Sequence, residues 1–211
     1  MREIGVDEAG KGPVIGSLFV AGVLNFDGLE QIGVKDSKKL SPARREYLAA
    51  LIEDATEVHV VEMTASEIDG DRKRQSLNVT MVDLFSAVVE RFQPDRAIVD
   101  AADVNQERFA SNIRSNYERN VKKEIDIISE WKADVHFPIV SAASIVAKVH
   151  RDRSIKQLAH EIDAEIGSGY PSDVKTIQFL KGLVKETGDN IPPYVRRSWK
   201  TVEKLISAEK G

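Results

Sequence analysis

One short segment, residues 4–13, constrains this chain more than any other and reads Ile-Gly-Val-Asp-Glu-Ala-Gly-Lys-Gly-Pro. Two adjacent carboxylates, Asp7 and Glu8, end an apolar run, where their mutual repulsion costs free energy unless a cation neutralises them. The glycines that follow allow a backbone to approach a phosphate or a sugar closely. Because hard divalent cations prefer carboxylates, the segment favours metal-dependent phosphodiester chemistry. A plain hairpin with an acidic turn is the alternative that this segment alone leaves open.

Length and composition indicate a globular protein without cysteine. The 211 residues suit one domain, or one domain with a small appendage, and allow a substantial hydrophobic core. The absence of cysteine excludes disulfides, thiolate nucleophiles and cysteine-bound zinc, and it fits a reducing compartment. Residues 1–20 lack the pattern of a signal peptide, and no apolar run has membrane-spanning length. We therefore expect a cytoplasmic protein with no membrane partner.

The formal net charge of −4 argues at first sight against a nucleic-acid partner. Carboxylates in a metal site would be offset by the bound cations, however, and a local positive stripe can bind phosphates on a mildly acidic protein. The basic residues do gather in groups, which are Lys35, Lys38 and Lys39; Lys148 and Arg151; and Arg196, Arg197 and Lys200. Net charge alone leaves the question open.

Alternating strand and helix patterns predict an α/β fold with a mixed sheet. Strands are expected at residues 3–7, 14–24, 57–64, 96–100 and 124–129. Helices are expected at residues 42–55, 76–92, 105–118 and 138–166, the first of them capped by Ser41 and Pro42. A last helix is expected to carry the apolar stripe Val195, Trp199, Val202 and Ile206.

The acidic residues lie at the ends of predicted strands. Asp7 and Asp100 each follow an apolar run, and ligands of α/β sheets bind where strands end. If the two strands are neighbours, Asp7, Glu8 and Asp100 converge. Asp134, just before the helix that Pro138 opens, is a fourth candidate. Taken alone it would be read as a solvated loop residue, and only its fit with the other three acids makes it a candidate ligand.

Six motifs in order resemble those of ribonuclease HII, most closely its archaeal branch. They are Asp-Glu-Ala-Gly-Lys-Gly-Pro at 7–13, Lys-Asp-Ser-Lys-Lys-Leu at 35–40, Ile-Val-Asp at 98–100, Pro-Ile-Val-Ser-Ala-Ala-Ser-Ile-Val-Ala-Lys at 138–148, Gly-Ser-Gly-Tyr-Pro-Ser-Asp at 167–173 and Val-Arg-Arg-Ser-Trp at 195–199. The resemblance implies a ribonuclease H-like catalytic core at residues 1–166, with a mixed five-stranded sheet flanked by helices. It also implies a helical C-terminal extension at 167–211 that lines a nucleic-acid groove.

The activity that the resemblance implies is endonucleolytic hydrolysis of the RNA strand of RNA–DNA hybrids and incision at ribonucleotides embedded in duplex DNA. The family's four acidic positions fall on Asp7, Glu8, Asp100 and Asp134, which are expected to be catalytic and to bind two divalent cations, Mn²⁺ or Mg²⁺. By family likeness Asp7 bridges the ions, with Asp134 on the side of the attacking water. Two such ions activate the water and stabilise the leaving 3′-oxygen, which gives 5′-phosphate and 3′-hydroxyl ends.

Substrate recognition is the second part of the resemblance. In such enzymes a Gly-basic-Gly turn and a tyrosine recognise the ribose at the RNA–DNA junction, and these positions are Gly10, Lys11, Gly12 and Tyr170 here. The 2′-hydroxyl distinguishes RNA from DNA at a single nucleotide. The family usually has Arg where Lys11 stands, and Lys lacks the planar fork for a bidentate contact. Further substrate contacts are expected from Lys39, Ser141, Lys148, Arg196 and Arg197. The alternative for Tyr170 is a half-buried loop aromatic.

Other interpretations compete with this one. Residues 5–11 read Gly-x-x-x-x-Gly-Lys, but Gly12 stands where a P-loop needs Ser or Thr, which argues against a nucleoside triphosphatase. A metal-dependent binding module without turnover is a second competitor, and ribonuclease HIII, which has an additional N-terminal domain, is a third. Archaeal relatives often end in an apolar-aromatic tail that binds the sliding clamp. Residues 207–211 show no such tail, so no clamp binding is expected, and we expect a monomer.

Overall fold

The computed structural model describes residues 1–34 and 40–209, which divide into two compact units. The sheet unit comprises Met1–Ala9, Phe19–Val61 and Ser76–His150, and the helical unit comprises Gly10–Leu18, Glu62–Gln75 and Arg151–Gly211. Each unit has its own cluster of buried hydrophobic residues. The boundary at residue 166 that the sequence suggests stays a prediction about folding units.

A five-stranded sheet in the order β3-β2-β1-β4-β5 is the centre of the sheet unit. Strand β1 pairs antiparallel with β2 and parallel with β4, and β4 pairs parallel with β5, so the predicted mixed sheet is confirmed. The crossing from an antiparallel to a parallel neighbour occurs at β1, the strand that carries the paired acids. The strand bounds are β1 (Glu3–Ala9), β2 (Leu18–Leu24), β3 (Val58–Met63), β4 (Arg96–Asp100) and β5 (Asp126–Glu130).

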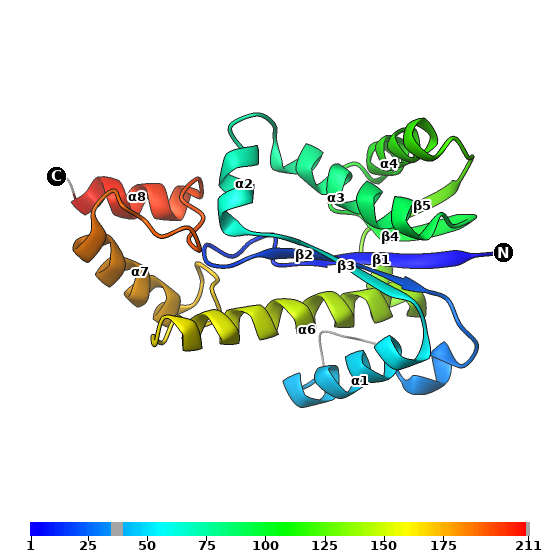
Figure 1. The fold of residues 1–211 in the computed structure, drawn as a ribbon, viewed down its shortest axis with the longest axis horizontal. Helices are drawn as coiled ribbons and strands as arrows, with labels where there is room; N and C mark the ends of the chain where they lie inside the picture. The colour runs from blue at the N-terminus through cyan, green and yellow to red at the C-terminus, as the bar shows by residue number, and fades with distance from the viewer. Residues whose placement is uncertain (35–39, 210–211) are drawn as a thin grey trace. The chain divides into compact units, whose positions relative to one another are not determined.

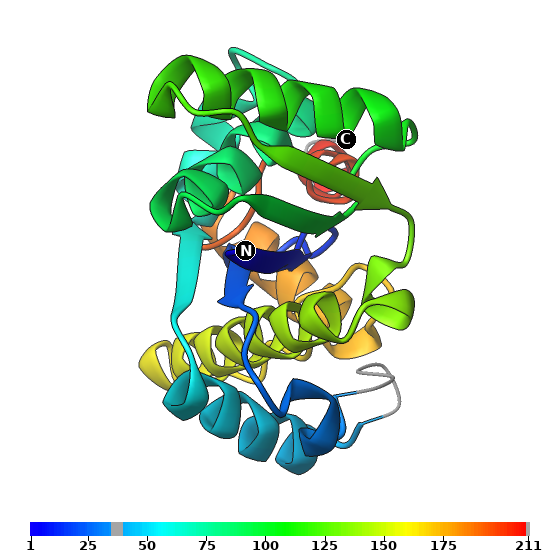
Figure 2. The ribbon, with the colours of Figure 1, turned by 90° about the vertical axis from the view of Figure 1, so that its right-hand side faces the viewer.

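Helices cover both faces of this sheet. Figures 1 and 2 show α3 and α4 on one face, with α1 and the first half of α6 on the other. The rings of Phe85 and Phe109 join α3 to α4 in an edge contact with centroids 5.1 Å apart. The helices of the sheet unit are η1 (Leu29–Ile32), α1 (Pro42–Ala55), α3 (Leu77–Phe92), α4 (Gln106–Val121), α5 (Ala133–His136) and the part of α6 (Pro138–Glu161) up to residue 150.

Local sequence explains where three of these helices begin. The side chains of Ser41, Ser76 and Asn105 accept hydrogen bonds from backbone N–H groups three residues later and so cap α1, α3 and α4. The predicted start of α1, with its capping Ser and following Pro, is therefore confirmed.

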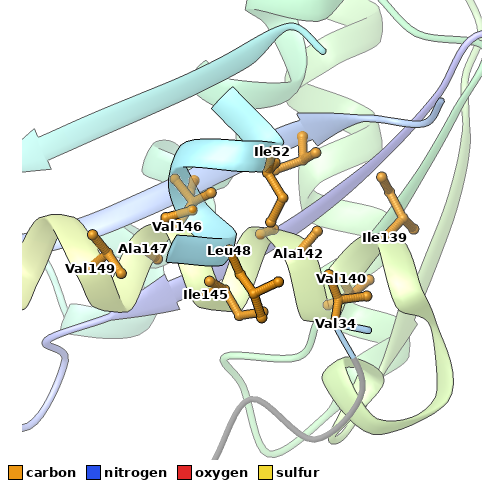
Figure 3. Packing of buried hydrophobic residues seen from close by; sticks show 14 of the residues in the cluster. Val34, Leu48, Ile52, Ile139, Val140, Ala142, Ile145, Val146, Ala147 and Val149 are labelled. Atoms are coloured by element: carbon orange, nitrogen blue, oxygen red, sulfur yellow. The ribbon is translucent and has the colours of Figure 1, made fainter. Parts of the chain in front are cut away.

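Helix α6 packs unusually close to β1. A Cβ atom added to Gly5 would lie 2.4 Å from the carbonyl carbon of Ile139, which no real side chain tolerates. Ala142, Ala143 and Ala147 on α6 are fully buried, so the predicted face of small residues does allow a close approach to the sheet. Figure 3 shows the side of this helix that packs against Leu48 and Ile52 of α1, where larger aliphatic side chains fill the core.

The helical unit is built from α2 (Ala65–Asp71), the end of α6, α7 (Val174–Thr187) and α8 (Lys200–Glu209). Its core joins loop residues Val14 and Ile15 to helical residues that include Ile155, Leu180 and Val202. Helix α2 begins at Thr64, which forms a reciprocal capping box with Glu67. No helix among residues 1–34 and 40–209 is long and apolar enough to cross a membrane.

Two predicted boundaries are wrong. The strand expected to start at residue 14 starts at Leu18, because Gly16 adopts a left-handed conformation (φ 86°) and Ile15 forms only an isolated bridge with Val195. The helix expected to run to residue 166 ends at Glu161, and Asp163 shortly after it is left-handed (φ 49°).

The predicted last helix is also shorter than expected. Val195 and Trp199 precede α8, because Val195 forms a bridge with Ile15, the N–H of Arg196 donates to the carbonyl of Val14 (2.9 Å), and the chain then turns at residues 197–199. Only Val202 and Ile206 of the predicted stripe are buried on α8 itself. Helices α2, α5 and α7 were not delimited by the sequence patterns.

Candidate active site

Three of the predicted acids meet at the carboxyl ends of two neighbouring parallel strands. Asp7 and Glu8 lie in β1 and Asp100 ends β4, and the register pairs Val6 with Val99, one residue before each aspartate. Among the described residues, one carboxylate oxygen each of Asp7, Glu8 and Asp100 lies within 4.8 Å of the others. The strands therefore do converge as the sequence suggested, and they form a compact cluster of hard oxygen ligands.

The environment of Asp7 opposes its ionisation. Its side chain is only 4% exposed, and burial raises its pKa well above the ordinary value of 3.8. The nearby carboxylates of Glu8 and Asp100 raise it further, while Lys148 and a hydrogen bond from the hydroxyl of Ser144 lower it. A buried carboxylate among like charges is the situation that a bound cation relieves.

Asp134 follows a residue, Ala133, that is hydrogen-bonded to Asp100 at this end of the sheet. It is the second residue of the short helix α5 and only 4% exposed, so the alternative of a solvated loop residue is excluded. The backbone N–H of the preceding residue, Ala133, donates to Oδ1 of Asp100 at 2.8 Å. Asp134 is not one of the three residues with oxygens within 4.8 Å of one another, and its role as a ligand stays a prediction.

Three polar residues of α6 follow one another at helical spacing and have different environments. The Ser141 hydroxyl donates to the carbonyl of Val34 and is 1% exposed, so it holds the chain at residue 34, and the substrate contact expected of Ser141 stays a prediction. Ser144, three residues later, binds Asp7 and accepts a hydrogen bond from Nζ of Lys148. Lys148 thus lies close enough to the acids for its positive charge to lower the pKa of Asp7.

Ser144 is the residue that sequence reasoning missed. The motif at 138–148 contains two serines on a helix of small residues, and nothing local tells which one faces the strand with the acids. The signal that could have found it is the spacing of four between Ser144 and Lys148, since residues at i and i+4 share a helix face. Lys39, another predicted substrate contact, lies outside the described residues, as do Lys35 and Lys38.

The loop that begins at Gly10 belongs to the helical unit and has a defined conformation. Gly10 is left-handed (φ 93°), and a Cβ there would lie 2.7 Å from the carbonyl oxygen of Ser17, so no other residue fits. The N–H of Val14 donates to the carbonyl of Gly169 (2.8 Å), which ties the loop to the segment that carries Tyr170.

Arg196 holds this loop from the inside. Its side chain is 0% exposed, and its guanidinium donates to the carbonyl oxygens of Gly10 (2.7 Å), Lys11 (3.2 Å) and Gly16 (2.9 Å). Burial lowers the pKa of Arg196 to about 10, which leaves it charged at neutral pH. Arg196 is therefore not part of a solvated face, because its guanidinium donates to the loop backbone, and the phosphate contact expected of it stays a prediction.

The contacts of Arg196 set the direction of the loop N–H groups. In a planar trans peptide the N–H points opposite to the C=O of the same unit. Because the carbonyls of Gly10 and Lys11 point to Arg196, the N–H groups of Lys11 and Gly12 point away from it. Two consecutive donors with the same orientation suit a ligand oxygen.

Tyr170 lies against this loop. Its Cε1 atom is 3.5 Å from the position that a Cβ on Gly12 would take, so the absence of a side chain at Gly12 leaves room beside the ring. The guanidinium of Arg151 lies 4.7 Å above the ring centroid and also donates to the carbonyl of Ser168. The structure thus brings Gly10, Lys11 and Gly12 together with Tyr170, and the role of this ring in substrate recognition stays a prediction.

Arg197 differs from its neighbour Arg196. Its backbone N–H donates to Asp69 (2.7 Å), its side chain is 53% exposed, and Nη1 donates to the carbonyl of Asp189 (2.8 Å). It lines a cavity of about 870 Å³ together with Arg72 and Lys73. A phosphate contact by Arg197 stays a prediction, as does the same role for Lys148.

The sequence matches a known family over almost its entire length. The family model described as Ribonuclease HII matches residues 4–202. The chain is 51% identical over 210 residues to the Ribonuclease HII of Methanothrix thermoacetophila, and the match covers 97% of each protein.

Solved structures share the fold. The ribonuclease H2 of Pyrococcus horikoshii OT3 gives a TM-score of 0.90 at 42% identity, covering 100% of this chain and 99% of that one. The PCNA:RNase HII complex of Archaeoglobus fulgidus gives 0.87 at 38% identity, covering 95% and 96%. Bst-RNase HIII in complex with Mn²⁺ gives 0.82 at 18% identity, covering 100% and 70%, a likeness of fold alone. The predicted ribonuclease H-like fold is confirmed, and by sequence and by fold the chain belongs to the ribonuclease HII family of endonucleases.

Proposed function

We propose that this protein hydrolyses the RNA strand of RNA–DNA hybrids and incises duplex DNA at embedded ribonucleotides, leaving 5′-phosphate and 3′-hydroxyl ends. The observation that carries the proposal is the cluster of Asp7, Glu8 and Asp100, which occupies strand ends in a chain of the ribonuclease HII family. Family membership supports the activity on hybrids, and the geometry of the acids and of the loop at Gly10 supports the residue roles.

The residues of the cluster fit a divalent cation. Their oxygens lie within 4.8 Å of one another, all three residues offer carboxylates, and burial together with like-charge repulsion raises the pKa of Asp7. Asp7, Glu8 and Asp100, with Asp134, would hold Mn²⁺ or Mg²⁺, two ions per site, which would supply an activated water and neutralise the leaving oxygen. The presence of Mn²⁺ with Bst-RNase HIII agrees with oxygen ligands of this kind.

The protein's own groups prepare Asp7 for this work. Lys148 and the Ser144 hydroxyl favour the ionised form of Asp7, which otherwise gains a proton because of its burial and its neighbours. The N–H of Glu8 donates to Oδ1 of Asp7 at 2.7 Å, which fixes the orientation of that carboxylate. Ser144 and Lys148 are therefore positioning residues for the acid cluster.

Recognition of the ribose would fall to the loop and Tyr170. The N–H groups of Lys11 and Gly12 point away from Arg196 and suit the 2′-hydroxyl, the group that marks RNA. The ring of Tyr170 would pack on the sugar that follows the scissile phosphate. Lys11 would contribute its backbone N–H. That contact does not depend on whether the side chain is Lys or the family's usual Arg.

The remaining expectations are also part of this proposal. A cytoplasmic location and a monomeric state fit a nucleic-acid enzyme without cysteine. A helical extension at 167–211 that lines a nucleic-acid groove and phosphate contacts by Lys39, Lys148 and Arg197 are proposed on family likeness. Binding to the sliding clamp is not part of the proposal.

One assay tests the activity. Duplex DNA with a single ribonucleotide and a long RNA–DNA hybrid are incubated with the protein in chelator, in Mg²⁺ and in Mn²⁺, and the product ends are mapped. We expect cleavage only with a metal, on the 5′ side of the ribonucleotide, with 3′-hydroxyl ends. Absence of cleavage of both substrates at all metal concentrations would contradict the proposal and favour a binding module without turnover.

Metal binding has an independent readout. A ligand that binds the native state raises the midpoint of thermal unfolding. Mn²⁺ should raise the midpoint of the wild-type protein and leave that of Asp100→Asn nearly unchanged. A matched control is Asp54→Asn on the exposed face of α1, which should respond to Mn²⁺ as the wild type does.

A further inference from the structure

Exposed apolar side chains lie in the two segments that carry Asp100 and Asp134. Val104, Trp131 and Val135 are exposed by 83%, 54% and 60% respectively, and all belong to the sheet unit. Single exposed hydrophobic residues are common and need no explanation. These three differ because they come from only two short segments, 101–105 and 131–135, each bonded to the acid cluster.

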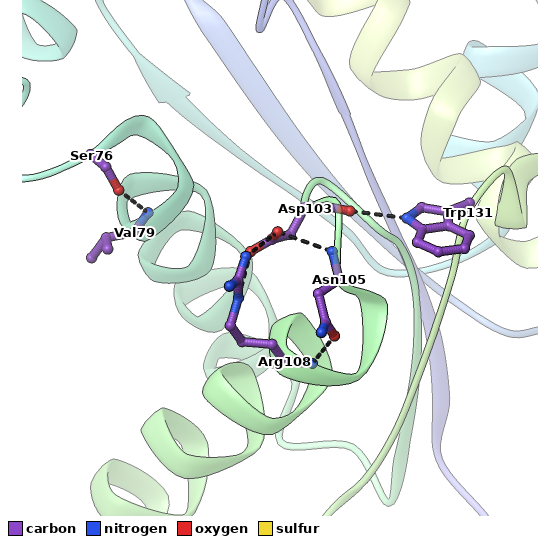
Figure 4. Close-up of polar contacts among 6 residues, drawn as sticks. All are labelled: Ser76, Val79, Asp103, Asn105, Arg108 and Trp131. Atoms are coloured by element: carbon purple, nitrogen blue, oxygen red, sulfur yellow. Dashed lines mark hydrogen bonds and ion pairs between the residues drawn. The ribbon is translucent and has the colours of Figure 1, made fainter.

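Trp131 is held in a fixed orientation although its ring is exposed. Its Nε1–H donates to the carbonyl oxygen of Asp103 at 3.0 Å, as Figure 4 shows. Asp103 is itself fixed by Arg108, whose Nη2 and Nε lie 2.6 and 3.2 Å from its carboxylate oxygens, and by the N–H of Asn105 (3.1 Å). The Arg108 guanidinium lowers the pKa of Asp103, so this support stays ionised at neutral pH.

The support of Trp131 is continuous with the acid cluster. The N–H of Ala101 donates to the carbonyl of Glu130 (2.9 Å), directly before Trp131, and the N–H of Ala133 donates to Oδ1 of Asp100 (2.8 Å). Between them Lys132 is left-handed (φ 59°), an uncommon conformation for a residue with a side chain. The segment is therefore locked at both ends to the strand that carries Asp100.

We propose that Trp131 packs its exposed ring on a sugar of the RNA–DNA hybrid next to the phosphate at the acid cluster, and that the exposed Val104 and Val135 of the same two segments add apolar surface. The inference rests on the proposed function. A nucleic-acid strand bound at Asp100 would pass residues 131–135, since the N–H of Ala133 donates to the carboxylate of Asp100. A ring whose polar N–H is already satisfied presents only apolar surface, and aromatic contacts of this kind tolerate any base. The contact would add affinity without sequence preference.

Nucleic acid is the occupant that the position favours. Lys132, which follows Trp131 in the chain, is exposed, and the carboxylate of Glu130, which precedes Trp131, lies 3.1 Å from Nδ1 of His136. A cation and an aromatic ring in one short segment suit a sugar-phosphate strand. A second copy of this chain is the other conceivable occupant. It would cover the same segment that carries Asp134 and would thereby obstruct the acids.

The experiment combines affinity with tryptophan fluorescence. All titrations use the Asp7→Asn background, so that the hybrid stays intact, and Trp131 and Trp199 are the chain's two tryptophans. Trp131→Ala should weaken hybrid binding by about tenfold, within the roughly five- to 150-fold range of a lost stacking contact. Trp131→Phe should recover most of that loss. The matched control is Tyr47→Ala, an aromatic on α1 with the same 54% exposure, which should bind as the background protein does.

Fluorescence identifies the residue directly. The hybrid should quench the emission of the background protein, and this change should vanish in Trp131→Phe, where Trp199 is the remaining reporter. Unchanged affinity and unchanged quenching in the Trp131 variants, in a protein whose wild type still cleaves hybrid, would overturn this inference alone. So would a concentration-dependent dimer in sedimentation that Trp131→Ala abolishes. A wild type that neither binds nor cleaves hybrid would instead contradict the proposed function.

Discussion

Nη2 of Arg196 lies 2.7 Å from the carbonyl oxygen of Gly10, a residue 186 positions earlier in the chain. One buried cation thereby holds the loop whose N–H groups are proposed to read the ribose. Lys presents its donors from a single nitrogen, whereas Arg196 uses three separate nitrogens for three carbonyl oxygens, so Arg and Lys are not equivalent at this position.

Arg196→Lys should slow cleavage at a single ribonucleotide while the protein still folds. Lost hydrogen bonds to a charged group cost about 1.5–3 kcal/mol each, so urea unfolding should show a clear but tolerable loss. Cleavage at a single ribonucleotide should fall by roughly tenfold or more, since 1.4 kcal/mol corresponds to a factor of ten. Arg197→Ala is the control, with a side chain 53% exposed, and should leave stability nearly unchanged. Equal losses of stability and of cleavage rate in Arg196→Lys and Arg197→Ala would mean that Arg196 does not position the loop.

Asp7→Asn should abolish turnover and stabilise the metal-free protein. The substitution keeps the shape of the side chain but removes the charge that burial, Glu8 and Asp100 oppose. Activity measured in Mn²⁺ should fall to background, while the free energy of unfolding in chelator should rise. A variant that cleaved at the wild-type rate, or that unfolded more easily without metal, would contradict the assigned role of this carboxylate.

The pH dependence of the metal-free protein follows from the same shift. The native pKa of Asp7 lies above its ordinary value of 3.8, so the native state binds more protons than the unfolded state between those two values. The contribution of Asp7 to stability is therefore fully present below about pH 3.8 and is lost as pH rises through its native pKa. Urea unfolding across this window should show a smaller decline with pH in Asp7→Asn than in the wild type. Parallel curves for the two proteins would refute the shift.

Ser144→Ala should affect the cleavage rate and Ser141→Ala the stability, although both remove a buried hydroxyl from α6. Ser144 binds Asp7, so its loss should slow cleavage by roughly fivefold, the equivalent of one hydrogen bond of about 1 kcal/mol. Ser141 binds the carbonyl of Val34, so its loss should lower the free energy of unfolding by a similar amount and spare the rate. Steady-state kinetics with urea unfolding of both variants separates the two roles.

Tyr170→Ala should impair cleavage at a lone ribonucleotide more than cleavage within a long hybrid. A stacking contact is worth about 1–3 kcal/mol, which corresponds to roughly tenfold or more on the junction substrate. Tyr170→Phe should retain most of the rate if the ring makes the contact. Measuring both substrates in one buffer cancels general damage to the fold, and equal losses on both would assign Tyr170 to structure.

Local sequence patterns predicted the acid cluster well for a physical reason. An apolar run that ends in a carboxylate gives both a strand and the position of its side chain at the strand's end, so Asp7 and Asp100 could be placed before the pairing was known. The pairing of β1 with β4 then brought them together. Asp134 was a candidate only through its place before the helix that Pro138 opens, and the family resemblance then supplied its expected role.

Contacts between distant segments could not be predicted in the same way. The role of Arg196 depends on a loop 180 to 186 residues away, and its local sequence resembles an exposed basic patch. The choice between Ser141 and Ser144 depends on the rotation of α6 about its axis, which sequence alone does not fix when small residues surround the helix. The support of Trp131 by Asp103 likewise joins segments that no local pattern connects.

The backbone contact between Gly5 and Ile139 has a consequence for the tolerance of the site to mutation. Because α6 rests on β1 main chain to main chain at this point, the separation of Asp7 from Ser144 depends on Gly5 and on the small residues of α6, such as Ala142 and Ala143, which allow this approach. Aliphatic exchanges in the core around Leu48 and Ile52 change how firmly α1 is attached, yet they leave this spacing alone. The larger aliphatic positions of this core can therefore vary at little cost to the chemistry, whereas a side chain at Gly5 would push α6 away from β1 and separate Ser144 from Asp7.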